Sequence, residues 1–203
     1  MQNILQSSGP ILLVIPDEAH SQEMSVALRI AHDLNTYHKL DANIITSSEA
    51  AAENLNQGNI IAIGNEASAC MRGLMLNTVH ECFTPVLDGP GLGSFRQCLL
   101  SLPNLDSGIL VLQAHPTLPG GRMILMQSTD STGLERAARL FPIRTGVAVP
   151  DWVIVGPKAD QIGASGIIGA GYVFRHILCG TQIFPSSVWG NEYTWNDAMS
   201  WTF

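Results

Sequence analysis

A chain of 203 residues is long enough to bury one hydrophobic core, which excludes a small scaffold held together by disulfides. Only 13% of the residues are charged, against about 25% in an average soluble domain, so we expect another domain or another copy to cover part of the surface. The net charge of −7, without any cluster of lysine or arginine, argues against nucleic acid or an anionic membrane as a partner.

The chain begins with a strand followed by a helix. The continuous apolar run 11–15 has the length of a buried parallel strand and stops at Pro16. From Ser21 the apolar residues recur at intervals of three and four, which predicts an amphipathic helix with Ser21 as its N-cap.

Two further strand and helix units follow. A short strand is predicted at 43–46, and the polar residues 47–49 suit the start of a helix over 50–55. The third unit is the clearest, with a strand at 59–64 and a helix at 66–76. Strands that alternate with helices in this way are typical of a parallel sheet.

The middle of the chain loses this alternation and then regains it. Residues 77–107 are rich in glycine and proline, which predicts a long irregular connection or a short subsidiary β element. Apolar runs at 109–113 and 123–127 flank the turn-forming stretch 115–121. These runs predict a hairpin, so one strand of an otherwise parallel sheet runs antiparallel.

One more helix and one more strand complete the predicted elements. Thr132 and Glu135 have the spacing of a capping box, and the helix that they open stops at Pro142. A final strand is predicted at 152–155.

The predicted fold is therefore α/β, an open, mostly parallel sheet with helices on both faces and one antiparallel hairpin. Residues 1–157 form this single sheet domain, and residues 158–203 form a glycine- and aromatic-rich tail. The tail packs on the sheet or on a domain outside this chain. Its large aromatic residues are Trp189, Tyr193, Trp195 and Trp201.

Candidate binding residues follow the predicted strands. In open α/β sheets, ligands bind beyond the carboxyl ends of the strands, which places Asp17, Asn65 and Asp130 on one rim together with Ser47 and Ser128. Helices that begin near this rim can hold an anion through free N–H groups, but simple capping explains their first residues as well. Acidic residues at two of three binding positions repel phosphates, so neutral sugars fit this rim better.

Catalytic motifs are weak in this sequence. The stretch 89–93 lacks the glycine spacing of a dinucleotide loop, and no Walker A sequence is present. Ser165 lies among small residues without the spacing of a nucleophile elbow, and Cys70 lies too far into its predicted helix. We therefore expect no catalytic residue in this chain.

Metal and cofactor sites are not expected either. The four cysteines, Cys70, Cys82, Cys98 and Cys179, contain no Cys-x-x-Cys pair and read best as packed thiols, although three disulfide pairings remain open. The histidines are scattered, and His115 reads as a polar residue of the hairpin turn.

The sequence shows no membrane or export signal. No apolar run approaches the ~18 residues of a membrane-spanning helix, and the amino terminus lacks the basic region of a signal peptide. We expect a cytoplasmic location for the chain as written, and secretion if the chain is a fragment of a larger protein.

Several stretches in the second half carry a family resemblance. Residues 106–112, 123–126, 131–146 and 149–157 resemble the carboxyl-terminal region of large fungal proteins whose upstream part is similar to a prolyl-oligopeptidase-like α/β-hydrolase. The resemblance implies that a serine hydrolase triad, where such a protein has one, lies outside this chain. The chain departs from the family pattern by inserting residues 172–188 before Trp189.

Three functions follow from these observations. The first is a non-catalytic accessory or assembly domain, with an upstream hydrolase-type domain or a second copy as its partner. The second is an independent small hydrolase that uses Ser165 or Cys70. The third is a domain that binds a small ligand or carbohydrate through Asp17, Asn65 and Asp130.

Overall fold

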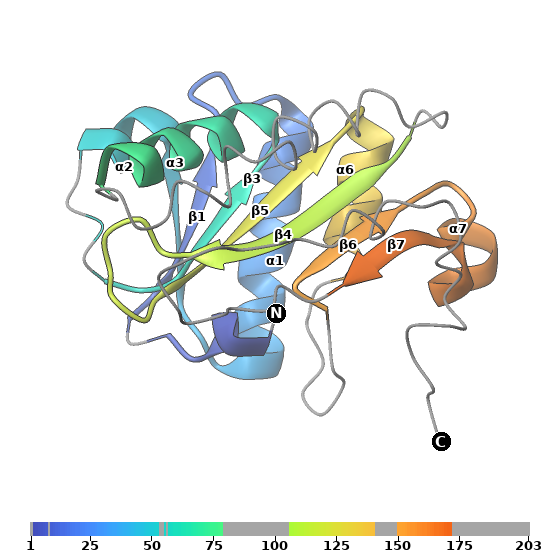
Figure 1. The fold of residues 1–203 in the computed structure, drawn as a ribbon, viewed down its shortest axis with the longest axis horizontal. Helices are drawn as coiled ribbons and strands as arrows, with labels where there is room; N and C mark the ends of the chain where they lie inside the picture. Colours follow the sequence, from blue (N-terminus) through green and yellow to red (C-terminus); the bar gives the residue numbers. More distant parts are fainter. Residues whose placement is uncertain are drawn as a thin grey trace, which may run out of the picture.

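The computed structural model describes residues 2–7, 9–52, 55, 57–78, 106–140 and 150–171. Figure 1 shows the fold. The elements in chain order are η1 (Gln2–Leu5), β1 (Ile11–Ile15), α1 (Ser21–His38), β2 (Ala42–Thr46), α2 (Ser47–Ala52), β3 (Ile60–Ile63), α3 (Asn65–Thr78), β4 (Gly108–Ala114), β5 (Arg122–Ser128), α6 (Ser131–Ala138), β6 (Trp152–Val155), α7 (Ala159–Ile162), η2 (Gly163–Gly166) and β7 (Ile167–Gly171).

The strands form one seven-stranded sheet in the order β2-β1-β3-β5-β4-β6-β7. β1 pairs in parallel with β2 and β3, and β3 pairs in parallel with β5. β4 lies antiparallel between β5 and β6, so the predicted hairpin is confirmed. The predicted α/β class with a mostly parallel sheet is confirmed as well.

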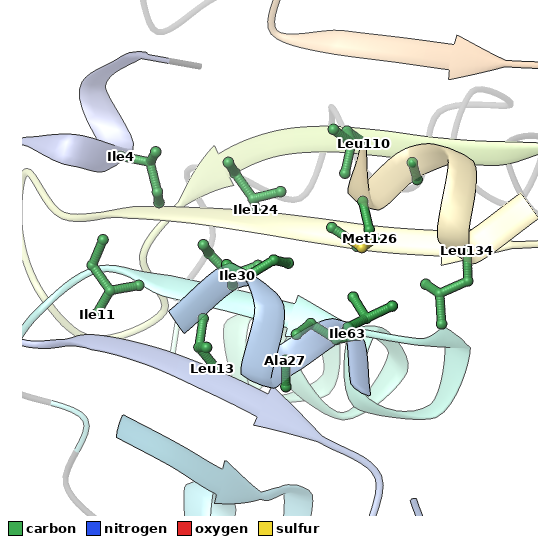
Figure 2. Packing of buried hydrophobic residues seen from close by; sticks show 14 of the residues in the cluster. Ile4, Ile11, Leu13, Ala27, Ile30, Ile63, Leu110, Ile124, Met126 and Leu134 are labelled. Carbon is green, nitrogen blue, oxygen red and sulfur yellow. The ribbon is translucent and has the colours of Figure 1, made fainter. Parts of the chain in front are cut away.

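Helices cover both faces of the sheet, as predicted (Figure 1). On one face, Ala27 and Ile30 of α1 and Leu134 of α6 pack against Leu13 and Met126 of the strands. Figure 2 shows these side chains meeting between helix and sheet. On the other face, α2 and α3 contribute their own apolar residues, Ala50, Ala67 and Met71. The alternation of side chains along each strand supplies both cores.

Strand β7 was not predicted. It pairs antiparallel with β6, so the sheet continues past residue 157, where the sequence placed the end of the sheet domain. Two of its five residues are glycines, and both lie under the indole of Trp152: a Cβ at Gly171 would come within 2.7 Å of Trp152 Nε1. Glycine at these positions hides the strand from pattern analysis, because it breaks the apolar signal that identifies strands. The aromatic residues predicted to dock, Trp189 to Trp201, lie outside the described residues.

The helix caps also differ from prediction. At α1 the N-cap is His20, without a side-chain hydrogen bond, and not Ser21. At α6 the N-cap is Asp130, whose side chain accepts from Gly133 N, so the predicted Thr132 capping box is wrong.

A reciprocal capping box occurs instead at α2. There Thr46 N donates to Glu49 Oε2 at 2.8 Å and Glu49 N donates to Thr46 Oγ1 at 3.3 Å. The helix therefore starts directly at the end of β2, earlier than the predicted range 50–55.

Candidate functional site

A pocket of about 420 Å³ opens at the carboxyl ends of three neighbouring strands, β1, β3 and β5. The chain leaves β1 and β5 toward α1 and α6 on one face, whereas it leaves β3 toward α3 on the other face. A crevice where connections diverge in this way is the usual ligand position in open α/β sheets. We call it the edge pocket, and its lining residues are Pro16, Glu18, His20, Ser21, Gln22, Glu23, Gly64, Asn65, Glu66, Ser128, Asp130, Ser131 and Leu134.

The lining of the edge pocket is acidic. It carries four carboxylates, Glu18, Glu23, Glu66 and Asp130, and the described lining residues include neither lysine nor arginine. Serine hydroxyls, the Gln22 and Asn65 amides and the His20 imidazole supply the remaining polar groups. Such a lining accepts hydrogen bonds from hydroxyl or amine groups and repels anions.

Glu23 lies in the edge pocket close to the carboxyl end of β3. It lies in the first turn of α1, where the helix dipole favours a carboxylate. A Cβ at Gly64 would lie 3.4 Å from Glu23 Cγ, in ordinary van der Waals contact, so the Glu23 side chain lies against the residue that follows β3. The φ of +93° at Gly64 is what favours glycine there. Glu23 Oε2 is buried and has no hydrogen-bond partner among the described residues, so it is an acceptor that the fold leaves unused.

Asp17, the first predicted binding residue, does not line the edge pocket. Its Oδ1 accepts a hydrogen bond from Ser48 N at 2.8 Å, at the start of α2. This backbone hydrogen bond lowers the pKa of Asp17. Asp17 therefore ties the turn that follows β1 to the start of α2, which follows β2.

Asn65, the second predicted binding residue, lines the edge pocket and also joins two strand ends. Its Nδ2 donates to Ser128 O at 2.8 Å, and Ser128 N donates to its Oδ1 at 3.1 Å. Both heteroatoms of the amide are thus occupied by backbone groups. Asn65 therefore shapes the wall of the pocket.

Asp130, the third predicted binding residue, caps α6 while it lines the pocket. Its Oδ1 accepts from Gly133 N at 2.8 Å, and its Oδ2 accepts from Asp106 N at 2.7 Å. Burial raises the pKa of Asp130, but these hydrogen bonds outweigh it and the net pKa is lowered. A hydrogen bond between the side chains of Asp106 and Asp130 raises the pKa of Asp106. Asp130 therefore stays ionised beside the pocket.

The candidate nucleophiles lie away from the edge pocket. Cys70 is half-buried on α3, its thiol contacts Ser47 O at 3.6 Å, and burial raises its pKa, which lowers its reactivity. Ser165 is exposed in η2. The glycine-rich stretch 89–93, and Cys82, Cys98 and Cys179, lie outside the described residues.

His115 occupies the hairpin turn, as predicted, but it is buried. Its Nδ1 accepts hydrogen bonds from Leu118 N at 2.9 Å and Thr117 N at 3.2 Å, while Nε2 is buried without a partner. Burial lowers the pKa of His115 to about 4. The imidazole is thus a neutral structural group of the turn, next to a cavity of about 250 Å³.

Metal ligation has no support in the part of the chain that the structure describes. There, no group of three or more histidine, cysteine or carboxylate side chains is arranged to hold an ion. The same ranges contain no helix that is long and apolar enough to cross a membrane.

Sequence reasoning missed most of the lining of the edge pocket. It identified residues that directly follow strands, but Glu23 and Glu66 come from the first turns of α1 and α3, and Glu18 comes from the turn between β1 and α1. A usable signal was present, since Glu23 and Glu66 are the acidic residues of the first turns of α1 and α3. That position also suits plain dipole stabilisation, so it does not identify a ligand site alone.

Comparison with known proteins gives one weak similarity. No protein-family model matches the chain. It is 22% identical over 163 residues to an "Uncharacterized secreted protein" of Arthroderma benhamiae. The match covers 76% of this chain and 16% of that protein, so the chain spans a small part of the length of this relative.

Proposed function

We propose that this chain is an accessory domain of a larger secreted, hydrolase-type protein, and that it binds a neutral, hydroxyl-rich ligand such as a carbohydrate in the edge pocket. The observation that carries the proposal is the pocket itself, an acidic hollow at the point where the strand connections diverge. Its volume of about 420 Å³ falls within the ~300–1,000 Å³ of small-molecule sites.

The charge of the lining supports a neutral ligand over an anionic one. A phosphate or carboxylate would approach four carboxylates, and the described lining residues include no lysine or arginine to offset them. A sugar hydroxyl, by contrast, donates to a carboxylate oxygen in a charge-assisted hydrogen bond. Glu23 is one such carboxylate, and its Oε2 has no hydrogen-bond partner among the described residues.

The accessory part of the proposal draws on the comparison and on the resemblance of residues 106–157. The relative is a much longer protein and is called secreted, and only 16% of it matches this chain. The candidate nucleophiles also favour this part of the proposal, since burial raises the pKa of the Cys70 thiol. A domain of this kind positions or recognises substrate for a catalytic domain elsewhere in the protein.

Calorimetry with a ligand panel tests the binding. The full chain is titrated with neutral mono- and oligosaccharides, sugar phosphates and nucleotides, and we expect heat from neutral sugars alone. The double variant Glu23→Gln, Glu66→Gln should lose about tenfold in affinity, because hydrogen bonds to carboxylates, about 1.5–3 kcal/mol each, are replaced by weaker ones to neutral amides, about 0.5–1.5 kcal/mol each. Asp41→Asn is the matched control, because Asp41 is exposed and precedes β2 at the opposite edge of the sheet.

Two results would overturn the proposal. Heat from phosphates, or equal binding by the double variant, would remove the edge pocket as a carbohydrate site. Turnover of peptidyl or acyl-ester substrates that disappears in Ser165→Ala or Cys70→Ala would make the chain an enzyme in its own right.

A further inference from the structure

One end of the sheet carries apolar side chains on the face that α2 and α3 cover elsewhere. Val111 lies directly opposite Leu125 in the β4–β5 pairing, which places it on the same face as the α2–α3 core. Ile109, Val111 and Ile154 form a separate buried cluster there, and Trp152 packs against it. We call this surface the end face.

The members of the end face are all strand residues. Ile109 is fully buried and Ile154 is 6% exposed. Neighbouring strands cover a side chain only from the side, so burial of this degree requires a layer on top of the sheet. The helices among the described residues supply this layer over β1, β3 and β5 but contribute no member to the end-face cluster.

The edge of the end face is the point from which the chain continues. Trp152 pairs with Gly171, the last residue of β7, and Ile154 pairs with Gly169. The indole of Trp152 lies over these two glycines, within 2.7–3.2 Å of where their Cβ atoms would be. Gly171, where this described range ends, therefore lies beside the ring.

We propose that residues 172–203 of this chain dock on the end face and complete the layer over β4, β6 and β7. The inference does not depend on the ligand proposed for the edge pocket. The sequence left two alternatives open, a tail that packs on its own sheet and a tail that packs on another domain. The proposal assigns residues 172–203 to the sheet of this chain.

Length, composition and charge support this occupant. Two strand spacings of about 4.8 Å separate β7 from β4, a distance that about three extended residues cross. The segment has 32 residues and contains three of the four tryptophans, at 189, 195 and 201. Only Arg175, Glu192 and Asp197 carry charge in this segment. Docking its apolar side chains therefore removes few charged groups from water.

Photo-crosslinking in the full chain tests the docking. Benzoylphenylalanine replaces Trp152, which it resembles in size, and in a second variant it replaces Gln113, which lies opposite Met123 on the same face. After irradiation and digestion, we expect captured peptides from 172–203 in both variants. An unfolding midpoint temperature equal to that of the wild type shows that each variant is folded.

The matched control places the same probe at Tyr37, which is 64% exposed on α1, on the opposite side of the sheet. This control should capture no peptide from 172–203. Capture of residues 79–105 by the end-face probes would assign the cover to the segment between α3 and β4 and overturn the proposal. A crosslinked dimer on a denaturing gel, or no capture by a folded variant, would overturn it as well.

Discussion

Asn65 and Ser128 exchange two hydrogen bonds: Asn65 Nδ2 donates to Ser128 O at 2.8 Å, and Ser128 N donates to Asn65 Oδ1 at 3.1 Å. The pair joins the first residue of α3 to the last residue of β5, on the wall of the edge pocket. A side chain that the sequence suggested as a ligand group thus fixes the distance between two strand ends.

Asn65→Ala should lower the free energy of unfolding by about 1–2 kcal/mol, because two backbone groups of Ser128 lose their partner. The loss stays at the low end of this range since water replaces part of these hydrogen bonds at an exposed position. Urea unfolding measures it, with Asn43→Ala on the exposed side of β2 as the control. Equal stability of the two variants would contradict this role for Asn65.

Gly133→Ala should destabilise the protein even though alanine is the better helix former. A Cβ at Gly133 would lie 2.2 Å from Ser107 O, a backbone atom that cannot rotate away. We expect a loss of about 2 kcal/mol, typical of overpacking after the gain in helix propensity is subtracted.

The control for Gly133 is a second helical glycine. Outside its own helix, Gly73 of α3 has no atom of the described residues within 4 Å of an added Cβ, so Gly73→Ala should stabilise by up to about 1 kcal/mol. Thermal unfolding of both variants shows whether each substitution raises or lowers the stability of the protein. The same sign for both would contradict the close approach of α6 to the segment before β4.

Asp130→Ala should cost about 1–2 kcal/mol, because it removes the cap of α6 and the acceptor for Asp106 N. Asp130→Asn keeps an acceptor for Gly133 N and should cost less. Chemical unfolding of the two variants at neutral pH checks the order. A smaller loss for alanine than for asparagine would contradict the capping role.

Acid should weaken the fold through His115. Its pKa is about 4 in the folded protein against 6.5 for a free imidazole, so the unfolded chain binds a proton that the folded one excludes. The contribution is fully present above pH 6.5 and is lost as the pH falls from 6.5 toward 4. The slope is at most about 1.4 kcal/mol per pH unit.

Unfolding free energies measured between pH 7 and pH 4 test this sign. His115→Gln should flatten the curve, because the substitution removes the buried imidazole. Parallel curves for the wild type and His115→Gln would mean that His115 titrates normally.

Much of the fold was predictable because the buried strands are continuous apolar runs. Residues 11–15 are an example: they form β1, the strand to which both β2 and β3 pair. The helix starts were harder, since the pattern Thr-x-x-Glu occurs at Thr46 and at Thr132. The capping box forms at Thr46, while at Thr132 the neighbouring Asp130 takes the cap. Local sequence does not show which acceptor reaches the free N–H groups.

The edge pocket was predictable in position and only partly in residues. Asn65 and Asp130 were predictable because they follow strands, and both line the pocket. Glu23 was not, because its place in the lining depends on how α1 packs beside the end of β3, where Glu23 lies close to Gly64. Contacts of this kind arise from tertiary packing between elements far apart in sequence.

The most direct test of the proposed binding site is a map of backbone amide chemical shifts during titration with the neutral sugar that gives the largest heat. We predict shifts concentrated at Gln22, Gly64 and Ser131 around the edge pocket, and their loss in the Glu23→Gln, Glu66→Gln double variant. Shifts centred on the His115 turn, or shifts unchanged in the double variant, would contradict the assignment of ligand binding to this pocket.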